Sequence, residues 1–116
     1  MATPYYTGTV VEESLTDQEL LNRLKRVKYS IVKMPNPNDD WHLYTVRVSA
    51  KEIGEISNSL KSRKWYAHFW RGRNVIVAFK GKLFRFNYDD KEASKPAVDY
   101  GLSIGIPRRQ LDFPID

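Results

Sequence analysis

Three β-rich runs that follow one another closely constrain the fold more than any other feature of this sequence. The runs cover 64–71, 74–80 and 82–87, and only Gly72-Arg73 and Gly81 lie between them. Connections this short join antiparallel neighbours, because a parallel crossover needs a dozen or more residues. The sequence therefore predicts a three-stranded antiparallel meander over 64–87.

Two capping-box patterns predict helices upstream of this meander. Thr16 and Glu19 are three residues apart, and so are Ser49 and Glu52. At this spacing a hydroxyl and a carboxylate satisfy two free N–H groups at a helix start. Apolar residues recur at three- and four-residue spacing after each pattern, ending in Leu60 in the second case. We therefore expect amphipathic helices over 16–28 and 49–62.

Two alternating runs predict a hairpin between these helices. Residues 29–34 and 41–48 alternate apolar and polar side chains, and the segment between them contains Pro35, Pro37 and several Asn and Asp residues. Such a cluster of turn formers ends a strand. We expect an antiparallel hairpin with a long loop, and a first strand over 5–11.

The C-terminal part predicts one short helix and an irregular tail. Ser94 is a candidate cap, Pro96 suits the first helical turn, and Gly105 suits the helix end. The expected inward side chains of this helix are Ala97, Val98, Gly101 and Leu102. After it, Leu111 and Phe113 are expected to pack against the sheet.

These elements predict one α+β domain over 1–116, with a mainly antiparallel sheet and helices packed on one face. If 5–11 is a strand, the order of elements matches a ferredoxin-like βαββαβ core with an added hairpin and a C-terminal helix. If it is not, the fold is a simpler α+β sandwich. The opposite sheet face is then partly solvated or covered by the C-terminal segment.

Composition excludes several classes of protein. The 116 residues contain no cysteine, which excludes disulfide scaffolds, thiolate zinc sites and cysteine nucleophiles. The glycines form no phosphate-binding loop, and no run of 18 apolar residues suggests a membrane span. We therefore expect a cytoplasmic protein with no membrane contact, no metal and no cofactor.

The positive charge is concentrated in the middle of the chain. The net charge is +5, but residues 20–85 hold fifteen bases and four acids, which gives +11. Residues 1–19 sum to −4 and residues 86–116 to −2. A basic segment attracts polyanions, and it also keeps an exposed strand edge from pairing. Both interpretations of the charge remain open.

The first run of the meander combines this charge with aromatic residues. Because side chains alternate along a strand, Tyr66, His68 and Trp70 share one face. Aromatic rings flanked by cations bind single-stranded nucleic acid, but the same rings can simply pack under the C-terminal tail. The residues predicted for this binding surface are Lys64, Tyr66, His68, Trp70, Arg71, Arg73, Lys80, Lys82 and Arg85, with Trp41 and His42 at the end of the long loop.

The histidines are the only basis for a catalytic hypothesis. His42 and His68 could act as acid and base, or bind a metal together with Asp39 or Asp40. Neither histidine has the His-x-Thr or His-x-Ser pattern of two-histidine phosphoesterases, and a hydrogen-bonded or exposed strand histidine is the favoured interpretation of each. We find no set of residues that predicts a particular reaction.

The expected function is a non-enzymatic protein-interaction or regulatory module. Its partner is another protein or a second copy of the chain, bound through a sheet face or edge. The alternative is a nucleic-acid-binding module that uses 64–73 within the basic meander 61–85. A small His-dependent hydrolase is the second alternative.

Overall fold

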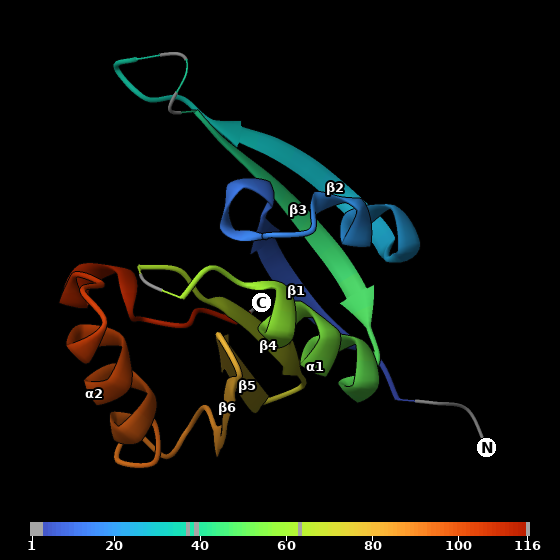
Figure 1. The fold of residues 1–116 in the computed structure, drawn as a ribbon. Coiled ribbons are helices and arrows are strands. Elements are labelled where there is room, and N and C mark those ends of the chain that lie inside the picture. The colour runs from blue at the N-terminus through green and yellow to red at the C-terminus, as the bar shows by residue number, and fades with distance from the viewer. Residues whose placement is uncertain (1–3, 37, 39, 63, 116) are drawn as a thin grey trace.

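The computed structural model describes residues 4–36, 38, 40–62 and 64–115, and it has an α+β fold (Figure 1). Across these residues six strands form one sheet in the order β2-β3-β1-β4-β5-β6, and every neighbouring pair is antiparallel. The elements are β1 (Tyr6–Val11), the 3-10 turns η1 (Glu12–Ser14) and η2 (Gln18–Arg23), β2 (Lys25–Val32), β3 (Trp41–Val48), α1 (Ala50–Ser59), β4 (Ala67–Arg71), β5 (Asn74–Phe79), β6 (Lys82–Asn87), α2 (Lys95–Ser103) and η4 (Arg108–Gln110).

The predicted meander is confirmed in β4, β5 and β6. Its first strand begins at Ala67 rather than at 64, and the pairing is continuous from Ala67↔Ala78 to Arg71↔Asn74. Gly72 and Gly81 lie in the two turns with φ of 60° and 69°. Glycine adopts this left-handed conformation without the steric cost of a side chain, which explains the tight connections.

The helix predicted over 16–28 is wrong. Only the short turn η2 forms there, and β2 starts at Lys25, four residues before the predicted strand at 29. The hydroxyl of Thr16 donates to the carbonyl of Ser59 at 3.0 Å, while Asp17 accepts a hydrogen bond from the Glu19 amide. Pairing with β3 extends the strand through residues whose local periodicity suits a helix, so tertiary structure overrides propensity.

The second helix is confirmed as α1, with the predicted capping box. The Ser49 hydroxyl accepts from the Glu52 amide at 3.2 Å, and the Glu52 carboxylate accepts from the Ser49 amide at 2.9 Å. The helix ends at Ser59, before the predicted limit of 62. Ile53 and Ile56 are fully buried, as their spacing predicts.

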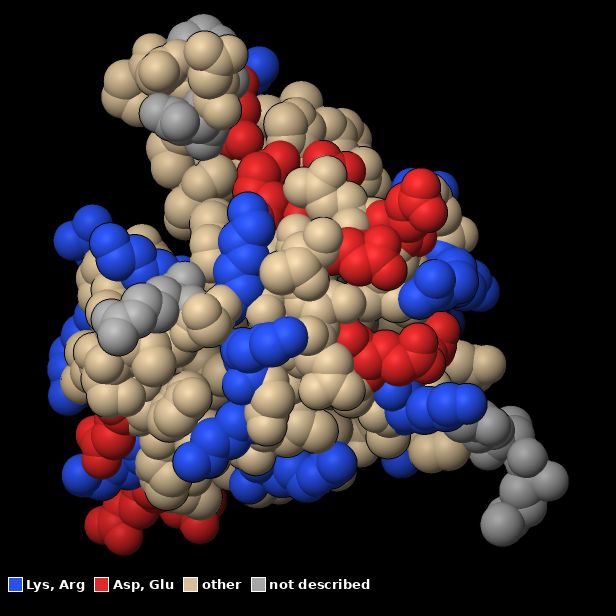
Figure 2. Space-filling model, in the orientation of Figure 1, with Lys and Arg blue, Asp and Glu red and all other residues tan. Residues whose placement is uncertain are grey.

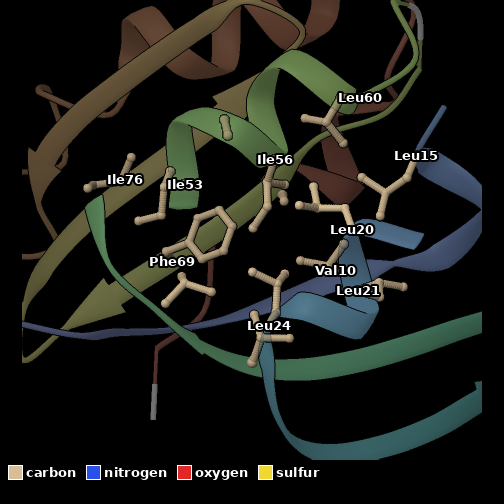
Figure 3. Packing of buried hydrophobic residues seen from close by; sticks show 14 residues of the cluster. Val10, Leu15, Leu20, Leu21, Leu24, Ile53, Ile56, Leu60, Phe69 and Ile76 are labelled. Carbon is tan, nitrogen blue, oxygen red and sulfur yellow. The ribbon is translucent and has the colours of Figure 1, made fainter. Parts of the chain in front are cut away.

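One hydrophobic core lies between the sheet and the layer formed by α1, η1 and η2. Figure 3 shows Phe69 of β4 among aliphatic side chains from this layer and from the strands. Val10 and Ile76 bring β1 and β5 to the same core. Leu20 and Leu21 are buried there too, so η2 retains the buried leucines predicted for a longer helix.

A second core covers the opposite face of the meander. Ala97 from α2 and Leu111 and Phe113 from the C-terminal segment pack there on Val75, Val77 and Phe79 of β5. The expected packing of Leu111 and Phe113 is confirmed. The expectation that helices cover one face holds for α1, but α2 lies on the other face.

The details of α2 follow the sequence except at two residues, Leu102 and Ser94, whose side chain makes no capping hydrogen bond and donates instead to the Lys91 carbonyl. Ala97 and Gly101 are buried, and Gly105, with φ of 95°, follows the helix end. Leu102 was predicted to face inward, but it is 38% exposed, so this prediction is wrong. A Cβ on Gly101 would lie 2.7 Å from Leu111, so the glycine lets the tail approach the helix closely.

The ferredoxin-like arrangement is not confirmed. Residues Tyr6–Val11 do form a strand, but β1 pairs with β3 in the antiparallel direction, from Tyr6↔Val48 to Val11↔Leu43. A split βαβ unit has parallel strands at this position, because a helical crossover returns the chain in the same direction. Only the short turns η1 and η2 lie between β1 and β2, and they supply no such crossover.

Candidate functional site

A cleft lined by aromatic residues lies on the sheet face opposite α1. Its volume is about 280 Å³, and the rings of Trp41 and Trp65 meet there with centroids 5.2 Å apart. We refer to it as the aromatic cleft. The residues that line it are Thr9, Val11, Trp41, Lys64, Trp65, Tyr66, His68 and Gln110. Four residues of the predicted binding surface, Lys64, Tyr66, His68 and Trp41, therefore come together.

The C-terminal segment covers part of the aromatic strand. The Tyr66 hydroxyl donates to the Gln110 carbonyl, and the His68 Nε2–H donates to the Pro114 carbonyl at 2.8 Å. Phe113 meets the Tyr66 ring edge-on at 5.5 Å. Burial raises the pKa of the Tyr66 hydroxyl and lowers the pKa of the His68 imidazole. The interpretation in which these aromatics pack under the tail fits Tyr66 and His68.

Lys64 stands at the edge of the aromatic cleft in an unusual backbone conformation. Its φ is 66°, in the left-handed region that residues other than Gly, Asn and Asp rarely adopt. Its aliphatic stem passes Gly105, where a Cβ would lie 3.5 Å from the Lys64 Cγ. The fold therefore fixes the start of this side chain at the cleft wall.

The remaining predicted binding residues spread away from the aromatic cleft. Trp70 stacks on His68 at 5.3 Å, and Arg73 forms an ion pair with Asp89. Lys80 donates to the Asn58 carbonyl. Lys82 lies 4.9 Å from the centre of the Tyr100 ring, and Arg71 and Arg85 are exposed. These cations do not form one row beside the aromatic rings.

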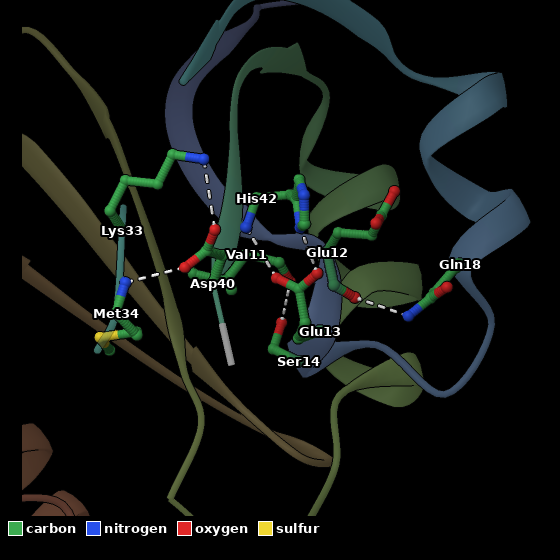
Figure 4. Close-up of polar contacts among 9 residues, drawn as sticks. All are labelled: Val11, Glu12, Glu13, Ser14, Gln18, Lys33, Met34, Asp40 and His42. Atoms are coloured by element: carbon green, nitrogen blue, oxygen red, sulfur yellow. Dashed lines mark hydrogen bonds and ion pairs between the residues drawn. The ribbon is translucent and has the colours of Figure 1, made fainter. Parts of the chain in front are cut away.

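The two histidines lie on opposite faces of the sheet. His42 shares the α1 face of the sheet with the buried Val46 and Val48. His68 is next to Phe69, which is buried on that face, so the His68 side chain lies on the other face. Paired catalysis or metal binding by the two imidazoles is therefore wrong for this fold. Asp40 is engaged by the Met34 amide at 2.8 Å and by Lys33 at 3.4 Å (Figure 4), and Asp39 lies outside the described residues.

His42 instead holds η1 against β3. The backbone amide and the Nδ1–H of His42 donate to the two carboxylate oxygens of Glu13, each at 2.7 Å (Figure 4). Glu12 completes a group in which one ligand atom from each residue lies within 4.8 Å of the others. Because Glu13 already accepts two hydrogen bonds from His42, we interpret this group as a structural contact.

The strand β2 is the most exposed apolar feature of the described residues. It forms one edge of the sheet, and all eight of its residues are exposed. Its large apolar side chains Val27, Tyr29, Ile31 and Val32 are 58%, 48%, 40% and 40% exposed. In Figure 1 the β2–β3 hairpin extends past the rest of the sheet. We refer to Lys25–Val32 as the β2 edge.

The β2 edge also carries exposed cations. Lys25, Arg26 and Lys28 are exposed, and Lys25 lies opposite the exposed Arg47 of β3. The acidic side chains of the view in Figure 2 gather mainly over η1 and η2, above the basic side chains around α1. The β2 edge was not predicted from the sequence, because residues 25–28 have the periodicity of a helix. The apolar residues at 27, 29, 31 and 32 were the available signal.

No protein-family model, curated protein or solved structure matches this chain. Within the described ranges, none of the helices has the length and apolar character needed to cross a bilayer. The interpretation of function therefore rests on the geometry of the β2 edge and the aromatic cleft.

Proposed function

We propose that this protein is a non-enzymatic interaction module that binds an extended acidic segment of a partner protein at the β2 edge. The observation that supports it is an eight-residue edge strand in which every residue is exposed, including four large apolar ones. An edge strand presents unpaired N–H and C=O groups, and an extended segment pairs with them as an additional strand.

The side chains of the β2 edge define the chemistry of this segment. Tyr29 and Ile31 lie opposite Tyr44 and His42 in the register, so they share the α1 face of the sheet. Lys28 points to the other face. A segment with alternating residues meets both faces at once, because side chains alternate along a strand. Apolar residues on the α1 side and carboxylates near Lys28 complement this pattern.

Charge favours an acidic partner over a second copy of the chain. Pairing of two β2 edges would bring Lys25, Arg26 and Lys28 of each copy to one seam, and neither strand contains an acid to offset this positive charge, whereas an acidic segment offsets it. The unpaired backbone groups favour a protein over a nucleic acid, since only another strand satisfies both their donors and acceptors. A homodimer and nucleic-acid binding are therefore the alternatives that the experiment must distinguish.

The test is fluorescence anisotropy with a labelled octapeptide of alternating glutamate and valine, which matches the eight residues of β2. Its control is the same peptide with alternate amides N-methylated, which keeps the charge but loses strand hydrogen bonds. We expect saturable binding of the first peptide and weak binding of the second. Single-stranded RNA titrated in parallel tests the nucleic-acid alternative, and light scattering tests the homodimer.

Charge-reversal variants locate the binding surface. Lys25→Glu with Lys28→Glu should weaken octapeptide binding about tenfold, because two exposed ion pairs of about 0.5–1 kcal/mol each are lost. The control pair Lys51→Glu with Lys91→Glu changes the net charge equally at two other exposed positions and should leave binding nearly unchanged. Equal loss in both pairs, or equal binding of both peptides, contradicts strand addition at the β2 edge.

A further inference from the structure

The aromatic cleft has the size and lining of a small-molecule site that strand addition at the β2 edge does not use. Its volume of about 280 Å³ lies at the lower end of ligand pockets, which are mostly apolar with a few placed polar groups. Trp41 and Trp65 form an aromatic corner, with their ring planes inclined by 57°. Such a corner offers ring faces to a flat ligand of one or two fused rings.

The described lining of the aromatic cleft carries one formal charge, that of Lys64, while Asp112 acts on Tyr66 and His68 from outside the lining. Of the described residues that line it, Lys64 is the only Lys, Arg, Asp or Glu. The other polar groups of the lining are the hydroxyl of Thr9, the amide of Gln110, and Tyr66 and His68, whose polar tips bond the C-terminal backbone. A lysine ammonium that no lining acid neutralises favours an anionic ligand group.

The backbone of Lys64 adopts an unusual conformation at the cleft. The left-handed backbone of Lys64 is a conformation that surrounding structure must impose, and strained positions of this kind cluster at ligand sites. A second hollow adjoins the first and shares Trp41, Lys64, Trp65 and Gln110 with it, bounded on its other side by Gly105 and Pro107. The stem of Lys64 along Gly105 therefore lies where the two hollows meet.

From this juxtaposition we infer that the aromatic cleft binds a flat aromatic anion, with its rings against Trp41 and Trp65 and its negative group at Lys64. The ligand class is an aromatic carboxylate with a single ring or two fused rings. This inference is independent of the proposed function, because none of the described residues that line the cleft belongs to the β2 edge.

The test is an NMR titration of the full ¹⁵N-labelled chain with 2-naphthoate, and with 2-naphthamide as its neutral counterpart. The chain has three tryptophans, and Trp41 and Trp65 line the cleft whereas Trp70 does not. We expect the indole N–H signals of Trp41 and Trp65 to shift saturably with naphthoate, and the Trp70 signal to shift much less. Naphthamide should bind more weakly.

Lys64→Met keeps the aliphatic stem and removes the charge. It should weaken naphthoate binding about fivefold and leave naphthamide binding within about twofold. Lys61→Met, at an exposed lysine outside the lining, is the matched control and should change neither affinity. Absence of saturable shifts at Trp41 and Trp65 overturns the inference. Equal affinity for the two probes, or an equal effect of Lys61→Met, overturns the anionic preference.

Discussion

Gly8 and Gly54 provide a matched test of the fold, because the same substitution should have opposite effects at the two positions. Gly8 lies in β1, where a Cβ would be 2.1 Å from the Phe69 Cδ1 and 2.8 Å from the His68 carbonyl oxygen. Gly54 lies in α1, where a Cβ meets nothing within 4 Å. The structure therefore predicts that only the first position depends on the absence of a side chain.

The magnitude for Gly8→Ala follows from the surroundings of Phe69. Ordinary contact begins at 3.4 Å, so the ring must retreat by 3.4 − 2.1 = 1.3 Å. Phe69 is fully buried among close-packed side chains, and the His68 carbonyl belongs to a strand paired on both sides. Overpacking in such a core costs about 1–3 kcal/mol, and the backbone contact places Gly8→Ala at the upper end, about 3 kcal/mol.

Gly54→Ala should instead stabilise the protein. An alanine in the middle of a helix is favoured over glycine by about 0.5–1 kcal/mol. The two variants should therefore differ by roughly 4 kcal/mol in the free energy of unfolding, which corresponds to roughly 15 °C in Tm for a domain of this size. Urea denaturation followed by tryptophan fluorescence measures the difference. Equal stability of the two variants would refute the position of Phe69 over β1.

Two further predictions concern the polar contacts. Glu13→Ala removes both hydrogen bonds accepted from His42, so the free energy of unfolding should fall by about 1–3 kcal/mol in urea denaturation, and Glu13→Gln should lose less. An undiminished stability in Glu13→Ala would count against this contact. Burial lowers the pKa of His68, so the unfolded chain binds more protons below its ordinary pKa of 6.5. Stability should be full above pH 6.5 and decline from there toward pH 5. In His68→Gln that decline should be smaller, and an identical decline would refute the burial of the imidazole.

The parts of the fold that the sequence predicted are those controlled by local interactions. Ser49 and Glu52 form a capping box by themselves, and the turns at Gly72 and Gly81 need only a residue that tolerates positive φ. The strand Trp41–Val48 was predicted at its observed limits, because alternation and a dense loop define both of its ends.

The errors arise where distant residues decide the structure. Lys25 and its neighbours have a helical periodicity, but pairing with β3 makes them a strand, as Lys25↔Arg47 shows. The antiparallel direction of β1 was missed for the same reason, because the helix predicted over 16–28 would have served as a crossover between parallel strands. The position of α2 also depends on distant contacts, since Ala97 packs on the face that the tail already covers.

The candidate sites were predictable to different degrees. Lys64, Tyr66 and His68 of the aromatic cleft were selected from one strand pattern, and Trp41 was selected from its place after the loop. A strand starting at 64 would place Trp65 on the core face with Ala67 and Phe69, yet β4 begins only at Ala67 and the alternation does not reach Trp65. The β2 edge was missed despite its apolar residues, because exposure of a strand depends on its place in the sheet.

Hydrogen–deuterium exchange of the β2 amides tests strand addition at the β2 edge most directly. Edge-strand N–H groups that face solvent exchange rapidly in the free protein and slowly once they pair with another strand. With the alternating glutamate–valine octapeptide bound, we predict slower exchange within Lys25–Val32 and unchanged exchange in β6, the opposite edge of the sheet. Unchanged exchange in β2 under saturating peptide, or protection confined to the basic meander β4–β6, would contradict the proposed function.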